Sequence, residues 1–220
     1  MAPASSASSA TTAKPGGPAP SRSLRLFAAL VEAEALRSAS RAPGPADSDL
    51  VRAFRGGATP KAALLDFLER IHRAGRLEGT SFVLAGVYLA RFCNSKTAIE
   101  AGLKLEPATA HRLAAVAVFV GAKFGGHPHK RWTPVFEVCS GRAIRADEMA
   151  ALERRFLRAI DYRLYVRSEE YDSFVRILVA GPQTLAAGSC SGGKRKAAGE
   201  VAERRRVRPC LPTPPVIAAI

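Results

Sequence analysis

The stretch Leu-Ala-Ala-Val-Ala-Val-Phe-Val-Gly-Ala at residues 113–122 carries no polar side chain on any side. Pro107 suits the first turn of a helix leading into it, and the glycine pair at 125–126 suits its end. The stretch is shorter than the roughly 18 apolar residues that a membrane span needs. A helix that is apolar all round in a water-soluble protein is enclosed by other helices. We therefore expect a buried helix here, at the centre of an α-helical bundle.

Further helical patterns lie on both sides of this central stretch. Apolar residues recur at helical spacing within residues 24–35, 60–74, 81–94, 146–162 and 168–178, and a short helix fits residues 132–138. Thr59 and Pro60 suit the N-cap and the first residue of the helix at 60–74. Prolines and glycines predict an irregular link over residues 43–57. No segment shows convincing strand-like alternation. The prediction is an all-α fold of about five or six helices around a buried central helix.

The two ends of the chain differ from the bundle in composition. Residues 1–23 contain no Leu, Ile, Val or aromatic residue, and residues 181–220 lose the helical pattern. Such segments bury too little apolar surface to offset their ordering entropy, so we expect disordered tails around a domain at 24–180. The lack of acidic residues before Glu32 also fits an organelle transit peptide, although the amphipathic arginine spacing of one is missing.

The net charge of +14 is spread unevenly. Residues 181–220 hold seven basic and two acidic residues, whereas residues 63–180 hold eighteen and thirteen. Two basic clusters within residues 194–208 suit a nuclear import receptor or phosphate backbones, and the alternative is a solubilising tail. Because basic and acidic residues nearly balance in residues 63–180, the charge gives little support to nucleic-acid binding across the whole domain. We expect the protein in the nucleus, in the cytoplasm or in both, and the basic clusters favour the nucleus.

The sequence carries few signs of chemistry. It has no phosphate-binding glycine loop, zinc-protease motif or nucleophile elbow, and the four cysteines match neither a disulfide framework nor a metal knuckle. His127 and His129 with Cys139 could nominally hold a metal, but a structural zinc site needs four well-spaced ligands. His72 and His111 are predicted to be surface side chains and not general bases. We expect no enzyme activity, no cofactor or metal, no small-molecule ligand and no membrane contact.

Two charged residues stand out by their positions. Lys123 ends the apolar helix, and Glu153 lies beside the apolar stripe of the helix at 146–162. Burying either group without a partner is costly. Either they pair with each other inside the domain, which desolvation favours, or they border a surface that another protein covers.

Five short motifs in order resemble a single cyclin box, most closely that of the plant P-type or U-type cyclins, which are similar to the fungal phosphate-pathway cyclin. The motifs are Asp66-Phe67-Leu68-Glu69-Arg70-Ile71, Tyr88-Leu89-Ala90-Arg91-Phe92, His111-Arg112-Leu113, Ala122-Lys123-Phe124 and Glu148-Met149 with Leu152-Glu153 and Phe156-Leu157. The resemblance covers residues 24–180, with the box at about 60–166. It implies that the third helix of the box is encircled by the others, which matches the stretch at 113–122.

The resemblance implies a regulatory subunit of a cyclin-dependent kinase, of the A-type class. Cyclins hold the mobile helix of the kinase inward, so that its Glu pairs with the ATP-site Lys. Cell-cycle cyclins use a Lys and a Glu for this contact, and these match Lys123 and Glu153. The resemblance therefore favours the interface over the internal pair for both residues.

Several positions depart from the family pattern. Ala90 replaces the usual Asp, and Lys61 stands where its Arg partner is expected, so that internal pair is lost. The substrate-docking motif of cell-cycle cyclins reads Pro60-Lys61-Ala62-Ala63-Leu64 here, which argues against docking of that kind. Arg145 or Ala146 replaces the usual capping Ser or Thr, a loss of ~1 kcal/mol. The alternatives to a kinase activator are a cyclin-fold protein associated with nucleic acid and an adaptor that has lost kinase affinity.

Overall fold

The computed structural model describes residues 21–40, 48–126 and 132–184. These residues form nine helices and no strand. The helices are α1 (Arg22–Ala39), α2 (Asp49–Arg55), α3 (Leu64–Gly75), α4 (Gly79–Cys93), α5 (Lys96–Glu100), α6 (Pro107–Phe124), α7 (Trp132–Cys139), α8 (Ala146–Ala159) and α9 (Ser168–Thr184). The predicted all-α fold is confirmed. Of the predicted tails, residues 1–20 and 185–220 lie outside the described residues, as do the basic clusters at 194–208, His127 and His129. Residues 22–23 belong to α1 and residues 181–184 to α9, so both predicted tails extend too far into the chain.

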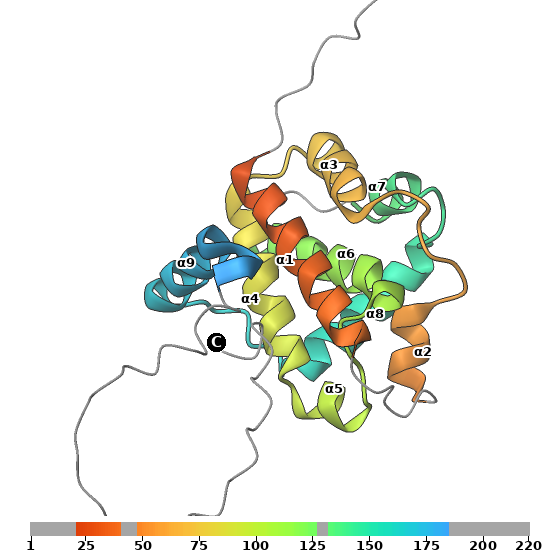
Figure 1. Cartoon of the computed structure of the whole chain (residues 1–220). Helices are drawn as coiled ribbons and strands as arrows, with labels where there is room; N and C mark the ends of the chain where they lie inside the picture. The colour runs from red at the N-terminus through yellow and green to blue at the C-terminus, as the bar shows by residue number, and fades with distance from the viewer. Residues whose placement is uncertain (1–20, 41–47, 127–131, 185–220) are drawn as a thin grey trace, which may run out of the picture.

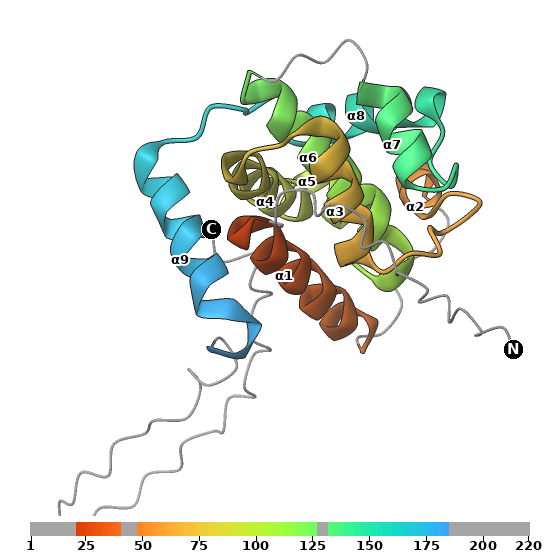
Figure 2. The same ribbon diagram turned by 90° about the horizontal axis from the view of Figure 1, so that it is seen from above.

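Helix α6 occupies the centre of the bundle, as its apolar sequence predicts. Every residue from Leu113 to Ala122 is buried. Helices α1, α2, α3, α4 and α8 all contact α6, and it lies in the middle of both views (Figures 1 and 2). The predicted encirclement of this helix is therefore confirmed.

Glycines allow α4 to pack closely against its neighbours. A Cβ on Gly121 of α6 would lie 2.7 Å from the Ser81 backbone oxygen in α4, so the two helices touch there through their backbones. A Cβ on Gly86 of α4 would lie 2.0 Å from the ring of Phe174 in α9. Helix α9 is thus seated on a small-residue position of α4, and in both views it lies on the side of the bundle away from α7 (Figures 1 and 2).

The predicted start of the second large helix is wrong. Pro60 is buried but not helical, and α3 begins four residues later, at Leu64. Side chains of α6 bind the backbone before it: Arg112 Nη1 donates to the Ala58 carbonyl at 2.7 Å, and His111 Nε2 lies 3.0 Å from the Ala62 carbonyl. A helix starting at Pro60 would give the Ala62 carbonyl to the amide four residues later, whereas here it lies against His111, and the segment from 58 to 62 runs outside any helix.

Two short helices lie where the sequence pattern predicted none. Helix α2 interrupts the predicted irregular link, with the Ser48 hydroxyl accepting from the Val51 amide at 3.2 Å and with Val51 and Phe54 buried. Helix α5 begins in the same way, with Ser95 accepting from the Ala98 amide at 3.1 Å. A local serine cap and one or two buried residues are enough to form each of them.

The predicted surface positions of the two helical histidines are also corrected. His72 is buried against the ring of Phe82, with 6.0 Å between ring centroids. His111 is half-buried and its ring lies 5.7 Å from that of Phe67. At the C-terminal end, α9 is interrupted at Gly181, whose φ of 70° is not helical.

Candidate functional site

Lys123 and Glu153 are brought together by the crossing of α6 and α8. Lys123 lies in the last turn of α6 and Glu153 in the middle of α8, and Lys123 Nζ is 2.6 Å from Glu153 Oε1. The side chains keep 34% and 15% of their surface exposed. The two residues therefore form an ion pair within the domain and at the same time reach its surface.

Aromatic rings lie on the Lys123 side of this ion pair. Lys123 Nζ lies 5.1 Å from the centroid of the Phe119 ring, close enough for a cation–π attraction. The next residue, Phe124, is 48% exposed and meets the ring of Tyr88 edge to face at 6.2 Å. An exposed aromatic beside a partly buried ion pair is an arrangement suited to binding a protein surface.

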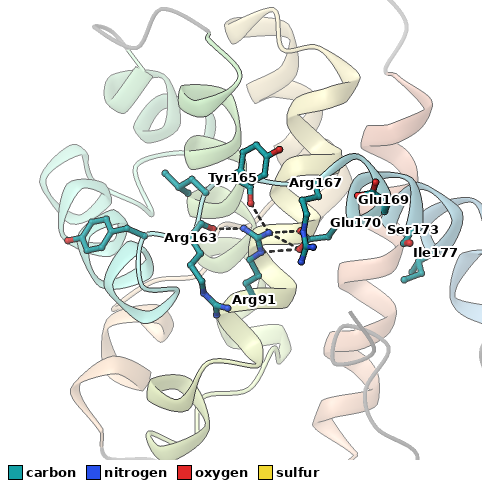
Figure 3. Close-up of a pocket in the computed structure, with 10 residues that line it drawn as sticks. Arg91, Arg163, Tyr165, Arg167, Glu169, Glu170, Ser173 and Ile177 are labelled. Carbon is teal, nitrogen blue, oxygen red and sulfur yellow. Dashed lines mark hydrogen bonds and ion pairs between the residues drawn. The ribbon is translucent and has the colours of Figure 1, made fainter.

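A second cluster forms around Arg91 at the end of α4. Arg91 Nη2 lies 2.6 Å from Glu170 Oε2 in α9 and donates to the Tyr165 carbonyl at 2.9 Å, and Nη1 donates to the Arg163 carbonyl (Figure 3). Tyr88 donates its hydroxyl hydrogen to the Leu164 carbonyl at 2.8 Å. These bonds fix the segment between α8 and α9, which has no regular structure of its own.

This Arg91 cluster lines a cavity of about 930 Å³ between the 162–167 segment and α9. Tyr162 and Tyr165 project from the segment and are mostly exposed. Burial raises the pKa of Tyr88 well above its ordinary value, so its hydroxyl stays protonated even in alkaline solution. Tyr88 contacts Phe124, the residue after Lys123, and also the 163–167 segment that lines the cavity. The side chain of Tyr88 therefore links the cavity to the region of the Lys123–Glu153 pair.

A third cluster centres on Arg112, which is almost completely buried in α6. Its Nε lies 2.6 Å from Glu148 Oε1, and its other nitrogens donate to the carbonyls of Arg55, Ala58 and Ala143 at 2.7–2.8 Å. Gly56 fits beside the guanidinium, since a Cβ there would lie 2.1 Å from Arg112 Cζ. Arg112 therefore ties the segment after α2 to the turn before α8.

Sequence reasoning anticipated one of these three clusters. Lys123 and Glu153 were identified because each charge stands against an apolar pattern. The same signal was present at Arg91, which ends the apolar run of α4, and at Arg112, which precedes the apolar core of α6. Their partners lie 79 and 36 positions away, too far for helical spacing to connect them.

The departures from the family pattern have clear structural outcomes. Ala90 is buried and Lys61 is exposed, so the structure contains no pair between these positions. The missing cap of α8 is compensated by its neighbours: Glu137 Oε2 accepts from the Ala146 amide at 3.0 Å, and Glu148 Oε2 accepts from the Arg145 amide at 3.3 Å. These bonds offset the predicted loss of about 1 kcal/mol.

The described residues offer little for metal or redox chemistry. Within them, no group of three or more His, Cys, Asp and Glu side chains could hold a metal ion. Burial raises the pKa of the Cys93 thiol to about 12, with the Glu34 carboxylate adding to the shift, so this sulfur stays protonated at neutral pH. No helix in the described ranges is long and apolar enough to cross a membrane.

Comparison with known proteins identifies the family. The family model described as Cyclin matches residues 5–164. The chain is 28% identical over 156 residues to Cyclin-P2-1 of Oryza sativa subsp. japonica, covering 70% of this chain and 68% of that protein. It is 25% identical to Cyclin-U4-2 of Arabidopsis thaliana and 29% to rice Cyclin-P4-1, over 56% and 58% of this chain. It spans only 54% and 57% of the length of those two proteins. The chain belongs to the cyclin family.

Proposed function

We propose that this chain is a regulatory subunit that binds and activates an A-type cyclin-dependent kinase through the mobile helix of that kinase. The cyclin family is regulatory rather than catalytic, and we assign no reaction to the chain itself. The observation that carries the proposal is the Lys123–Glu153 pair, partly exposed beside Phe124 at the surface of a cyclin fold.

The paired state of Lys123 and Glu153 suits them to a protein interface. An ammonium group has three donors and a carboxylate two acceptor oxygens, so one mutual bond leaves both groups able to bond a partner. Because each charge already neutralises the other, covering the pair costs less than covering two separate ions. Charge-assisted bonds to the backbone of the kinase helix would fix its orientation, and Phe124 would supply apolar contact.

Activation would follow from this docking. A kinase helix held inward keeps its Glu against the ATP-site Lys, which the phosphoryl-transfer site requires. The cyclin acts in this model by shifting the kinase between two conformations, so its effect depends on how much more tightly it binds the active one.

A pull-down with matched activity measurement tests the proposal. The full chain, tagged and expressed in plant cells, should co-purify an A-type cyclin-dependent kinase, and adding the chain to that purified kinase should raise its phosphorylation of a histone substrate. The Arg154→Ala variant, which changes an exposed residue next to Glu153, should behave like the unmodified chain. Failure of any cyclin-dependent kinase to bind would contradict the proposal.

We also propose that residues 194–208 direct the protein to the nucleus through an import receptor. The two basic clusters in this segment support the proposal. Deleting 194–208 from a fluorescent fusion should move the signal from nucleus to cytoplasm, whereas deleting 1–20 should leave it unchanged. An unchanged distribution after the first deletion, or a plastid signal lost after the second, would contradict it.

A further inference from the structure

A groove with only basic charges lies apart from the proposed kinase contact. It has a volume of about 570 Å³ and is formed by the segment before α3, by α3 itself and by the turn between α7 and α8. Its lining residues are Ala58, Thr59, Lys61, Ala62, Arg70, Ser140, Gly141, Arg142 and Ala143. None of these is acidic, and none belongs to the Lys123–Glu153 pair or to the cavity at Arg91. We call it the basic groove.

The three cations of the basic groove are unengaged. Lys61, Arg70 and Arg142 are exposed, and their side chains make no hydrogen bond or ion pair with any described residue. Most other arginines of the bundle differ in this respect, for example Arg73, which pairs with Glu69 at 3.1 Å. Three like charges around one cavity repel each other, and an anion between them would relieve that repulsion.

The walls that present these cations are held rigidly. Buried Arg112 donates at 2.7 Å to Ala58 on one wall and at 2.7 Å to Ala143 on the other, so one side chain links both. The Ser140 hydroxyl accepts from the Ile144 amide at 3.0 Å and closes the turn that carries Arg142. Such pre-organisation lowers the entropy that ligand binding costs.

Arg142 also has an unusual backbone conformation. Its φ is 64°, directly after Gly141 at 63°, and its amide donates to the Glu137 carbonyl at 2.8 Å. The left-handed region is unfavourable for a residue with a Cβ. The turn therefore holds an arginine at the groove where glycine or asparagine would suit the backbone better.

We propose that the basic groove binds a phosphorylated serine or threonine in an extended segment of another protein. Two guanidinium groups and an ammonium group match the three acceptor oxygens and the charge of nearly −2 of a phosphorylated side chain. Exposed cations hold a free phosphate ion only weakly, because water screens them. The groove is larger than one phosphate, and its alanine walls at 58, 62 and 143 leave room for neighbouring residues of a peptide.

A nucleic acid fits this groove less well than a phosphopeptide. Duplex binding relies on cations spread along a face that follows many phosphates, whereas here three cations surround one cavity. The three cations also come from three separate parts of the chain, the segment before α3, α3 itself and the turn between α7 and α8, and not from one continuous face of a helix. Duplex DNA therefore serves as the competing ligand in the test.

Fluorescence anisotropy with the full chain tests the proposal. The probe is a labelled phosphothreonine peptide mixture with randomised flanking positions, compared with the same mixture carrying unmodified threonine, at about 150 mM salt. The chain should bind the phosphorylated mixture about tenfold or more tightly. Replacing Lys61, Arg70 and Arg142 by Gln should remove most of that preference.

A matched variant controls for net charge. Replacing the exposed Arg25, Arg154 and Arg158 by Gln removes the same three charges elsewhere and should leave the preference intact. Equal losses in both triple variants, no preference for the phosphorylated mixture, or an equal loss of affinity for a 20-base-pair DNA duplex would each overturn the proposal. Circular dichroism of both variants shows that the fold is retained, and single substitutions replace the triple variant if it is not.

Discussion

Arg112 and Glu148 form an ion pair of 2.6 Å in which the arginine side chain is only 2% exposed. Its guanidinium also satisfies three backbone carbonyls from segments that are not adjacent in the chain. In this cyclin the buried cation of α6 therefore connects the end of α2, the segment between α2 and α3, and the turn before α8. The position that usually carries an internal acid–base pair of the family holds Ala90 instead.

Arg112→Ala should strongly destabilise the fold. Removal of the guanidinium takes this donor from three carbonyls and leaves Glu148 Oε1 without its cation, and such losses cost about 3–5 kcal/mol. Arg112→Lys should also be destabilising, since an ammonium cannot reproduce the planar set of donors. Urea unfolding gives the free energies. Arg154→Ala, at an exposed position of α8, should change the free energy of unfolding by less than about 0.5 kcal/mol. A loss below 1 kcal/mol for Arg112→Ala would contradict this role.

Gly86→Ala should weaken the seating of α9. The new methyl group would lie 2.0 Å from the Phe174 ring, and overpacking of this kind costs about 1–3 kcal/mol, more than the helix propensity that alanine gains. Thermal unfolding and amide exchange in α9 measure the effect. Gly57→Ala is the matched control, because nothing lies within 4 Å of a Cβ there. The double variant with Phe174→Leu should recover part of the loss, and full additivity of the two changes would argue against the clash.

The stability of the fold should fall as the pH drops below about 6.5, in part through His111. Its Nε2 lies 3.0 Å from the Ala62 carbonyl, and its Nδ1 is buried without a partner. Burial lowers the pKa of His111 below its ordinary value of 6.5 and outweighs the opposite effect of the bond to Ala62. The unfolded chain then binds a proton at a higher pH than the folded one, so acid favours unfolding once the pH passes below the unfolded pKa.

The difference between His111→Gln and the unmodified chain isolates this contribution. Gln can keep an N–H donor towards Ala62 but does not titrate, so the variant should lose less stability between pH 7.5 and pH 5. Urea unfolding at several pH values gives the comparison, and the other histidines cancel in the difference. Parallel pH profiles for the two proteins would refute a role for His111.

The elements that the sequence predicted well are those with a strong pattern of their own. Helix α6 could be predicted with its position in the bundle because it has no polar face. Helices α2 and α5 could not, since seven and five residues with one or two buried positions give no periodicity to detect. The start of α3 was misplaced because Thr59 and Pro60 give a good local signal, while the hydrogen bonds that override it come from α6.

The candidate site shows the same limit. The charge of Lys123 and Glu153 against apolar surroundings marked both residues, and the sequence even left open that they pair. That they form an ion pair of 2.6 Å at an edge that stays partly exposed depends on the crossing of α6 and α8. The basic groove could not be predicted from the sequence, because its three cations come from positions 61, 70 and 142 and no helical or motif spacing relates these positions.

The kinase contact at Lys123 and Glu153 is the central claim, and exchanging the two charges tests it most directly. Lys123→Ala and Glu153→Ala should each weaken kinase binding by well over tenfold, since truncating one member of a desolvated charged contact costs about 2–5 kcal/mol. Because the pair is partly exposed, the free energy of unfolding should change by only about 1 kcal/mol.

The decisive measurement is the kinase affinity of the double variant Lys123→Glu with Glu153→Lys, taken beside its melting temperature. The exchange can re-form an ion pair between α6 and α8, so the melting temperature should return towards that of the unmodified chain. Each charge would then face the wrong group on the kinase, and binding should remain lost. A double variant that is stable and binds the kinase normally would show that the pair serves the fold alone and would contradict the account.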